Sequence, residues 1–215
     1  MNINPTSKRI LCFGDSNTWG YVPATGKRYP VGVRWTSLLQ EKLGDGYEII
    51  EEGLNSRTTD IDDPKHKGKN GLTYLRPCLE THDPIDLIIL MLGTNDMKER
   101  FNREPSRIVE GIENLIDEIK KYALEEETIE PQVIIVSPPL VDETVEGVKE
   151  KYLGAGGKST KLGELYEKVA KKFNYKFIDI SKVVSPSKKD GYHLEPESHQ
   201  VIADLFFNEI KTIWQ

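Results

Sequence analysis

The sequence is poor in cysteine, with only Cys12 and Cys78 among its 215 residues. Two cysteines this far apart provide neither a disulfide framework nor the paired spacing of a cysteine-based metal site. Cys12 falls inside a short apolar run, where it is expected to be a small core residue. The sequence therefore predicts no metal site, and its cysteine content does not require an oxidising compartment.

Long apolar runs and a strong charge bias are also missing. No window approaches the roughly 18 apolar residues of a membrane-spanning helix, and the first eight residues lack the apolar core of a signal peptide. The formal net charge is -6 and the pI about 5.4, with both signs mixed along the chain. These features predict a cytoplasmic protein whose partners include neither a nucleic acid nor a membrane.

The chain does contain a regular alternation of apolar and amphipathic segments. Strands are expected over residues 8–13, 47–51, 86–92, 132–137 and 176–180. Helices are expected over residues 33–43, 72–81, 105–122, 162–173 and 196–214. Such alternation is typical of a parallel sheet with helices on both faces. We therefore expect one α/β domain spanning residues 1–215, a three-layer α/β/α flavodoxin-like sandwich whose five-stranded parallel sheet has the order 2-1-3-4-5.

Two long segments, 62–76 and 138–160, are expected to be largely irregular. The second contains Gly154, Gly156 and Gly157. Loops of this length are often lids, binding loops or oligomer contacts. They are expected to shape any pocket that the domain contains.

The polar segment 13–20, Phe-Gly-Asp-Ser-Asn-Thr-Trp-Gly, directly follows the first expected strand. Open α/β sheets bind their ligands at the carboxyl ends of the strands, so Ser16 stands where a catalytic residue would be placed. The same residues are also typical of an ordinary strand-to-loop turn in which Asp15 and Ser16 bond local backbone. The octapeptide alone does not decide between these interpretations.

Three more polar segments follow other expected strands, and they contain Ser56, Asn95, Asp190 and His193. The carboxyl ends of parallel strands lie along one edge of a sheet. These four side chains and Ser16 are therefore expected to converge, although they are far apart in the sequence.

The pair Asp190 and His193 suits general acid–base chemistry. An imidazole can accept a serine proton near neutral pH and return it later. A carboxylate on its other ring nitrogen fixes the tautomer, and the Asn95 amide can donate to an oxyanion. Each motif also has a plainer interpretation, a chance surface pair for D-x-x-H and a capping turn for residues 93–96. His199, inside the last expected helix, is the rival base.

Taken together, four segments resemble the SGNH hydrolase family, the GDSL-like esterases. They are FGDSN (13–17), EGLNS (52–56), GTND (93–96) and DGYH (190–193), in the order and spacing of that family. The resemblance covers nearly the whole chain and is closest to the arylesterase and acyltransferase branch. It implies that Ser16 is the nucleophile, His193 the general base and acid, and Asp190 its orienting carboxylate.

The resemblance also implies an oxyanion hole made by the Ser16 N–H, the backbone N–H at Ser56 and the Asn95 side chain. The family usually has glycine where Ser56 stands, and Gly53 is either an alternative donor or a structural glycine. Proteins of this branch form oligomers, so a homo-oligomer built through the two long loops and Trp214 is expected. No metal and no organic cofactor is implied.

The residues beside these positions have expected roles of their own. Asp15 and Asp96 are expected to hold their loops by bonding backbone N–H groups, instead of serving as the catalytic acid. Trp19 either walls the acyl pocket or belongs to the core. Arg34 and Arg57 are expected to make surface ion pairs.

The predicted function is that of a serine esterase acting on a small-molecule ester. It would cleave small acetyl or aryl esters through an acyl-enzyme on Ser16, which water or another alcohol resolves. A carbohydrate acetylesterase or a thioesterase would use the same residues. The alternative of another class is a non-catalytic binding module on a flavodoxin-like sheet. The absence of the G-x-G-x-x-G and P-loop patterns argues against it.

Overall fold

The structure is a computed structural model that describes residues 4–214. Its centre is one sheet of five parallel strands: β1 (Lys8–Gly14), β2 (Tyr47–Gly53), β3 (Leu87–Met91), β4 (Gln132–Ser137) and β5 (Lys176–Asp179). The strands are ordered β2-β1-β3-β4-β5, and every neighbouring pair is parallel. The predicted sheet and strand order are thus confirmed.

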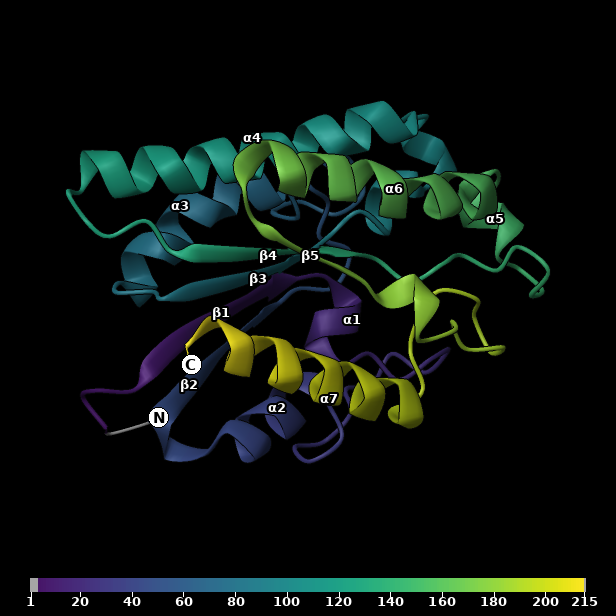
Figure 1. The fold of residues 1–215 in the computed structure, drawn as a ribbon. Helices are drawn as coiled ribbons and strands as arrows, with labels where there is room; N and C mark the ends of the chain where they lie inside the picture. The colour runs from purple at the N-terminus through teal and green to yellow at the C-terminus, as the bar shows by residue number, and fades with distance from the viewer. Residues whose placement is uncertain (1–3, 215) are drawn as a thin grey trace.

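Helices cover both faces of the sheet (Figure 1). One layer contains α3 (Gly71–His82), α4 (Pro105–Glu125) and α6 (Ala155–Phe173). The other layer contains α2 (Trp35–Leu43) and α7 (Pro196–Ile213). Two single-turn helices, α1 (Ser16–Trp19) and α5 (Lys149–Tyr152), lie toward the carboxyl ends of the strands. This arrangement is the predicted α/β/α sandwich.

The central strands are apolar throughout because both of their faces are buried. In β1, Leu11 and Phe13 pack in the core under α3, α4 and α6, whereas Ile10 and Cys12 pack in the core against α2 and α7. Cys78 belongs to the first of these cores and Cys12 to the second, so the two free cysteines lie on opposite faces of the sheet.

The long helix α4 packs an apolar face on the sheet. The face of α4 that meets the sheet is made of Ile108, Ile112, Leu115, Ile116 and Ile119, all fully buried. Its other face is polar, as expected of a helix that covers a sheet. Within residues 4–214, none of the helices has both the length and the apolar character needed to cross a bilayer.

The segment 138–160 differs from its prediction. It contains α5, and α6 begins at Ala155, seven residues before the expected start. The carboxylate of Glu143 accepts hydrogen bonds from the N–H groups of Gly154 and Gly156 and so caps the start of α6. Glycines usually signal a loop, but here a contact from outside the helix stabilises its first turn.

Candidate active site

Ser16 lies where β1 ends and the short helix α1 begins. Gly14 is the last residue of β1, and a Cβ at this position would lie 2.0 Å from the Thr18 hydroxyl, so the tight turn requires glycine. Asp15 caps α1 by accepting a hydrogen bond from the Asn17 N–H at 2.9 Å. The turn fixes Ser16 at the carboxyl edge of the sheet, where the residue is 7% exposed.

Ser16 is hydrogen-bonded to the histidine and carboxylate that the sequence analysis selected. His193 Nε2 lies 2.9 Å from Ser16 Oγ, and His193 Nδ1 lies 2.7 Å from Asp190 Oδ2. The Asp190 carboxylate also accepts the backbone N–H groups of Ala24 and His193, which hold it in place. The three side chains therefore form a continuous chain of hydrogen bonds.

The electrostatics of this chain favour an ionised carboxylate. Burial raises the pKa of Asp190, but the hydrogen bonds and charge of His193 outweigh burial and keep that pKa below its usual value. An ionised Asp190 accepts the proton on Nδ1 of the neutral imidazole. Nε2 is then left as the acceptor that faces Ser16.

Asn95 and Ser56 reach the same pocket from two other turns. Asn95 begins a short 3-10 helix, Asn95–Met97, after β3, and its amide nitrogen donates to the Arg57 carbonyl at 2.9 Å. Ser56 has a φ of 67°, in the left-handed region that favours glycine. Ser16, Ser56 and Asn95 all line one pocket, so the expected convergence of these residues is present.

Gly53 has a different surrounding. It ends β2, and a Cβ there would lie 2.2 Å from the backbone nitrogen of Trp19. Gly53 does not line the pocket at Ser16. Its contacts are those of a structural glycine that lets β2 approach α1 closely, which leaves position 56 as the stronger candidate for the backbone donor.

The two neighbouring aspartates hold loops, as their positions predict. Asp96 is fully buried and accepts hydrogen bonds from the backbone and hydroxyl of Thr59 and from Arg103 at 2.9 Å. Burial raises its pKa to about 6 despite these partners. Burial also raises the pKa of Asp15, whose carboxylate caps α1. Neither aspartate accepts a hydrogen bond from His193.

Trp19 does not line the pocket, so the hypothesis that it forms the acyl wall is wrong. It is half-buried outside the pocket, with the Arg28 guanidinium 5.3 Å from its ring centroid. Tyr21, two residues later, lines the pocket and stacks on His193. Nothing in the spacing of the Gly- and Tyr-containing loop distinguishes these two aromatics, and the sequence analysis missed Tyr21.

His199, the rival base, is buried in α7 away from Ser16. Its Nδ1 accepts a hydrogen bond from the Trp35 N–H at 3.3 Å, and its ring meets the Tyr29 ring edge-on. Burial lowers the pKa of His199 to about 4, with smaller contributions from Arg34 and His193. A structural role within the α2–α7 layer accounts for these contacts.

The prediction that Arg34 and Arg57 make surface ion pairs is wrong, because both residues are buried. Arg57, 2% exposed, donates to the backbone carbonyls of Gly14 and Glu52. It thereby joins the carboxyl ends of β1 and β2. Arg34 pairs with Glu51 at 2.8 Å. Isolated charges in a polar loop give no signal that distinguishes such buried roles from surface pairs.

Both long loops contribute to the pocket, which has a volume of about 380 Å³. Lys65 and His66 come from the first loop, and Lys151 and Tyr152 come from α5 in the second. The sequence gives no signal for His66, because nothing in it shows which loop residues face Ser16.

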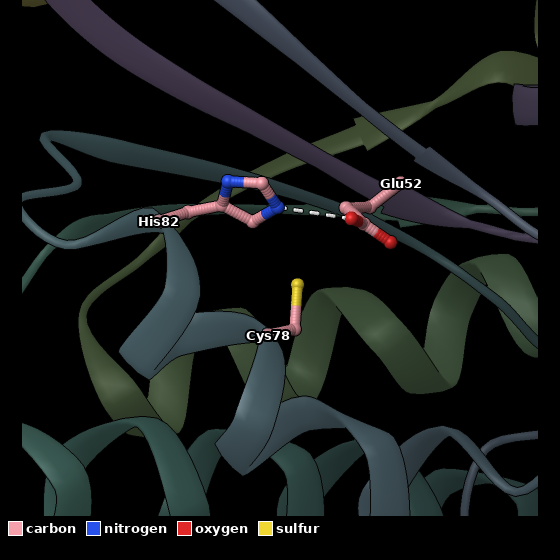
Figure 2. Close-up of side chains that lie close together, drawn as sticks. All are labelled: Glu52, Cys78 and His82. Carbon is pink, nitrogen blue, oxygen red and sulfur yellow. Dashed lines mark hydrogen bonds and ion pairs between the residues drawn. The ribbon is translucent and has the colours of Figure 1, made fainter.

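A second cluster consists of Glu52, Cys78 and His82 (Figure 2). None of the three lines the pocket at Ser16. One potential ligand atom from each lies within 4.8 Å of the others, and His82 Nε2 is 3.0 Å from Glu52. The Arg57 guanidinium, 3.7 Å from the same carboxylate, already supplies a positive charge there. Burial and Glu52 raise the pKa of the Cys78 thiol to about 12, which keeps it protonated. The cluster is explained by the contact between His82 and Glu52 and by the ion pair between Arg57 and Glu52.

Comparison with known proteins identifies the family of the chain. Residues 12–201 match the model of the GDSL-like Lipase/Acylhydrolase family. The chain belongs to this family. The resemblance predicted from the four motifs is confirmed, and the chain is a carboxylic ester hydrolase of the GDSL type.

Several solved structures share this GDSL fold. The aryl esterase of M. smegmatis is 38% identical with a TM-score of 0.90, over 96% of this chain and 99% of that chain. Est24, a carbohydrate acetylesterase from Sinorhizobium meliloti, is 36% identical with a TM-score of 0.91, over 97% and 100%. A lipase/acylhydrolase from Enterococcus faecalis, 23% identical with a TM-score of 0.71 over 95% and 96%, shares the fold. A comparison with curated proteins found no match.

Proposed function

We propose that this GDSL-family chain is a serine esterase that hydrolyses small acetyl or aryl carboxylic esters through an acyl-enzyme on Ser16. The observation that carries the proposal is the 2.9 Å contact between Ser16 Oγ and His193 Nε2, with Asp190 bonded to the opposite ring nitrogen. A serine hydroxyl is a weak nucleophile until a positioned base accepts its proton.

The reaction would proceed in two halves. Ser16 Oγ attacks the ester carbonyl while His193 takes the hydroxyl proton, and Asp190 stabilises the imidazolium that forms. His193 then gives this proton to the departing alcohol, which leaves the acyl group on Ser16. Water enters, loses a proton to His193 and releases the carboxylic acid, which restores the free serine.

The negative charge of each tetrahedral intermediate needs donors that are already in place. The backbone N–H groups of Ser16 and Ser56 and the amide of Asn95 are the proposed donors. All three residues line the pocket that contains Ser16 Oγ. The Asn95 amide donates to the Arg57 carbonyl at 2.9 Å and to the Asp15 carboxylate at 3.4 Å, so its position is set before the charge develops.

Substitution of the triad tests the proposal. We expect Ser16→Ala and His193→Ala to lose nearly all turnover of p-nitrophenyl acetate while keeping the fold, as judged by circular dichroism. His199→Gln is the matched histidine control and should keep its turnover. A fluorophosphonate probe should label native protein but not Ser16→Ala, because it reacts only with an activated serine. Full activity of a folded Ser16→Ala variant would refute the proposal, and absence of labelling would favour a binding module.

Likeness to Est24 supports a second candidate, the removal of acetyl groups from a carbohydrate. A thioester or an acceptor alcohol would use the same residues. Turnover should be compared across aryl esters of increasing acyl length, acetylated sugars and an acyl thioester, in water and with added alcohol. Formation of a new ester in alcohol would identify acyl transfer, whereas the acetylated sugar as best substrate would select the carbohydrate reaction.

Assembly and location belong to the same proposal. We infer a cytoplasmic homo-oligomer, in line with the mild acidic charge and the branch that the motifs resemble. Size-exclusion chromatography with light scattering measures the mass directly, and a monomer would refute the assembly. Fractionation of cells that express the protein tests its location.

A further inference from the structure

The pocket in front of Ser16 carries an excess of positive charge. Its wall includes Lys65, Lys98, Arg100 and Lys151, whereas no aspartate or glutamate among the described residues lines it. The cations come from three separate parts of the chain: the loop after β2, the segment after β3, and α5. A positive charge assembled from three segments at one pocket requires an explanation.

Only one of these four cations has a carboxylate partner. Arg100 forms an ion pair with Asp63, a buried side chain. Within residues 4–214, no carboxylate lies within ion-pair distance of Lys65, Lys98 or Lys151. These three ammonium groups around the pocket therefore make no ion pair within the described chain, although Asp63, Asp15 and Asp96 act on Lys98 from a greater distance.

Lys98 is the most informative of the three because it is 7% exposed and is the single buried lysine of the described chain. Its Nζ lies 6.0 Å from the centroid of the Tyr152 ring. The buried arginines Arg34 and Arg57 face carboxylates at 2.8 and 3.7 Å, but Lys98 has no such partner. A buried unpaired ammonium is unfavourable, and an anion in the pocket would offset this cost.

We propose that the pocket accepts esters whose non-reacting part carries a carboxylate or phosphate that pairs with Lys98 and is attracted by Lys65 and Lys151. The inference rests on the proposed function, since it takes Ser16 as the nucleophile of this pocket. A charge-assisted hydrogen bond is strong enough to change kcat/KM about tenfold to a hundredfold.

The anionic group could belong to the acyl part or to the alcohol part of the ester, so the test has two arms. The acyl arm compares p-nitrophenyl hemisuccinate with its methyl ester. The alcohol arm compares 4-acetoxybenzoate with methyl 4-acetoxybenzoate. Each kcat/KM is divided by the rate of alkaline hydrolysis of the same compound, which removes differences in intrinsic reactivity. The readout is the ratio of the anionic to the neutral ester.

In one arm the native protein should prefer the anionic ester at least tenfold. Lys98→Met, which removes the charge and keeps a long apolar side chain, should bring the ratio near one. Lys151→Gln, a change at an exposed residue, should lower it partly. Lys171→Gln is the control, because Lys171 lies near the end of α6 and is paired with Glu167. It should leave both rates unchanged.

Two results would overturn the inference: a ratio near one in both arms for native protein, or an unchanged ratio in folded Lys98→Met. If Lys98→Met does not fold, two other measurements test the inference. The ratio should fall in Lys151→Gln, and added salt should lower the ratio of the native protein because salt weakens a charge preference. An unchanged ratio in both would overturn the inference. If Ser16→Ala loses turnover but the native protein shows no preference for the anionic ester, this inference alone is refuted. Retained turnover in folded Ser16→Ala would instead refute the esterase mechanism.

Discussion

The phenol ring of Tyr21 stacks on the imidazole of His193, with ring centroids 4.2 Å apart and an interplanar angle of 21°. The ring of Tyr192 contacts the same imidazole at 4.5 Å. Asp190 restrains His193 from one end of the ring, whereas these aromatics restrain the plane of the ring. The imidazole therefore has little freedom to leave Ser16.

Replacing Tyr21 should impair catalysis without removing any group that transfers a proton. A stacked aromatic pair contributes about 0.5–1.5 kcal/mol, so we expect Tyr21→Ala to lower kcat about two- to tenfold. Tyr21→Phe keeps the ring and should stay near the native value. If Tyr21→Phe lost as much as Tyr21→Ala, the hydroxyl and not the stacking would be the important group.

Ser56 should act through its backbone, so its side chain should be dispensable. At a φ of 67°, glycine is the residue that fits with least strain. We expect Ser56→Gly to keep activity within about threefold and to raise the free energy of unfolding by up to about 1 kcal/mol. Ser56→Ala retains the N–H and should also remain active, although without the gain in stability. A large loss of kcat in both variants would assign a role to the hydroxyl.

His199 should make the fold sensitive to acid. Its pKa in the folded protein is about 4, against about 6.5 for a free histidine, so the unfolded chain binds an extra proton between these values. The free energy of unfolding should therefore fall as the pH drops from 6.5 toward 4, by about 2 kcal/mol between pH 7 and pH 5. Urea denaturation of native protein and His199→Gln at both pH values isolates this contribution. Equal losses in the two proteins would contradict it.

The preference for the anionic ester should weaken at high pH, because it depends on the charge of Lys98. Burial, together with the charge of Arg100, lowers the pKa of Lys98 to about 8. The ammonium is charged below this value, so the ratio of anionic to neutral ester should fall as the pH rises from 7 to 9. The other charged groups that face Lys98 are Asp63, Asp15 and Asp96. Lys98→Met serves as the control and should show a flat ratio, while a flat native ratio would exclude the effect.

Most of the architecture could be predicted because its signal lies in short stretches of sequence. The segment Leu87–Met91 is apolar on both faces, which is typical of a central parallel strand, and the alternation of strands and helices then fixes the sheet. The placement of Ser16 and His193 at one edge follows from the same topology. The apolar pattern of each strand, together with the rule that alternating strands and helices form a parallel sheet, is sufficient to predict the sheet and the edge at which Ser16 and His193 lie.

What could not be predicted depends on contacts between distant residues. Tyr21 and Trp19 differ in function only because one of them faces His193. Arg57 is buried because two strand carbonyls, those of Gly14 in β1 and Glu52 in β2, meet at its guanidinium. The early start of α6 depends on Glu143, outside the helix. No periodicity in the sequence records such pairings.

The proposed nucleophile and its proposed base are separated by 177 positions in the chain. During synthesis, Ser16 leaves the ribosome long before His193 does. Ser16 therefore has no partner for its hydroxyl proton until the segment that contains His193 has been made and has reached the carboxyl edge of the sheet. In a newly made chain, the onset of ester hydrolysis can thus report the moment at which this segment docks.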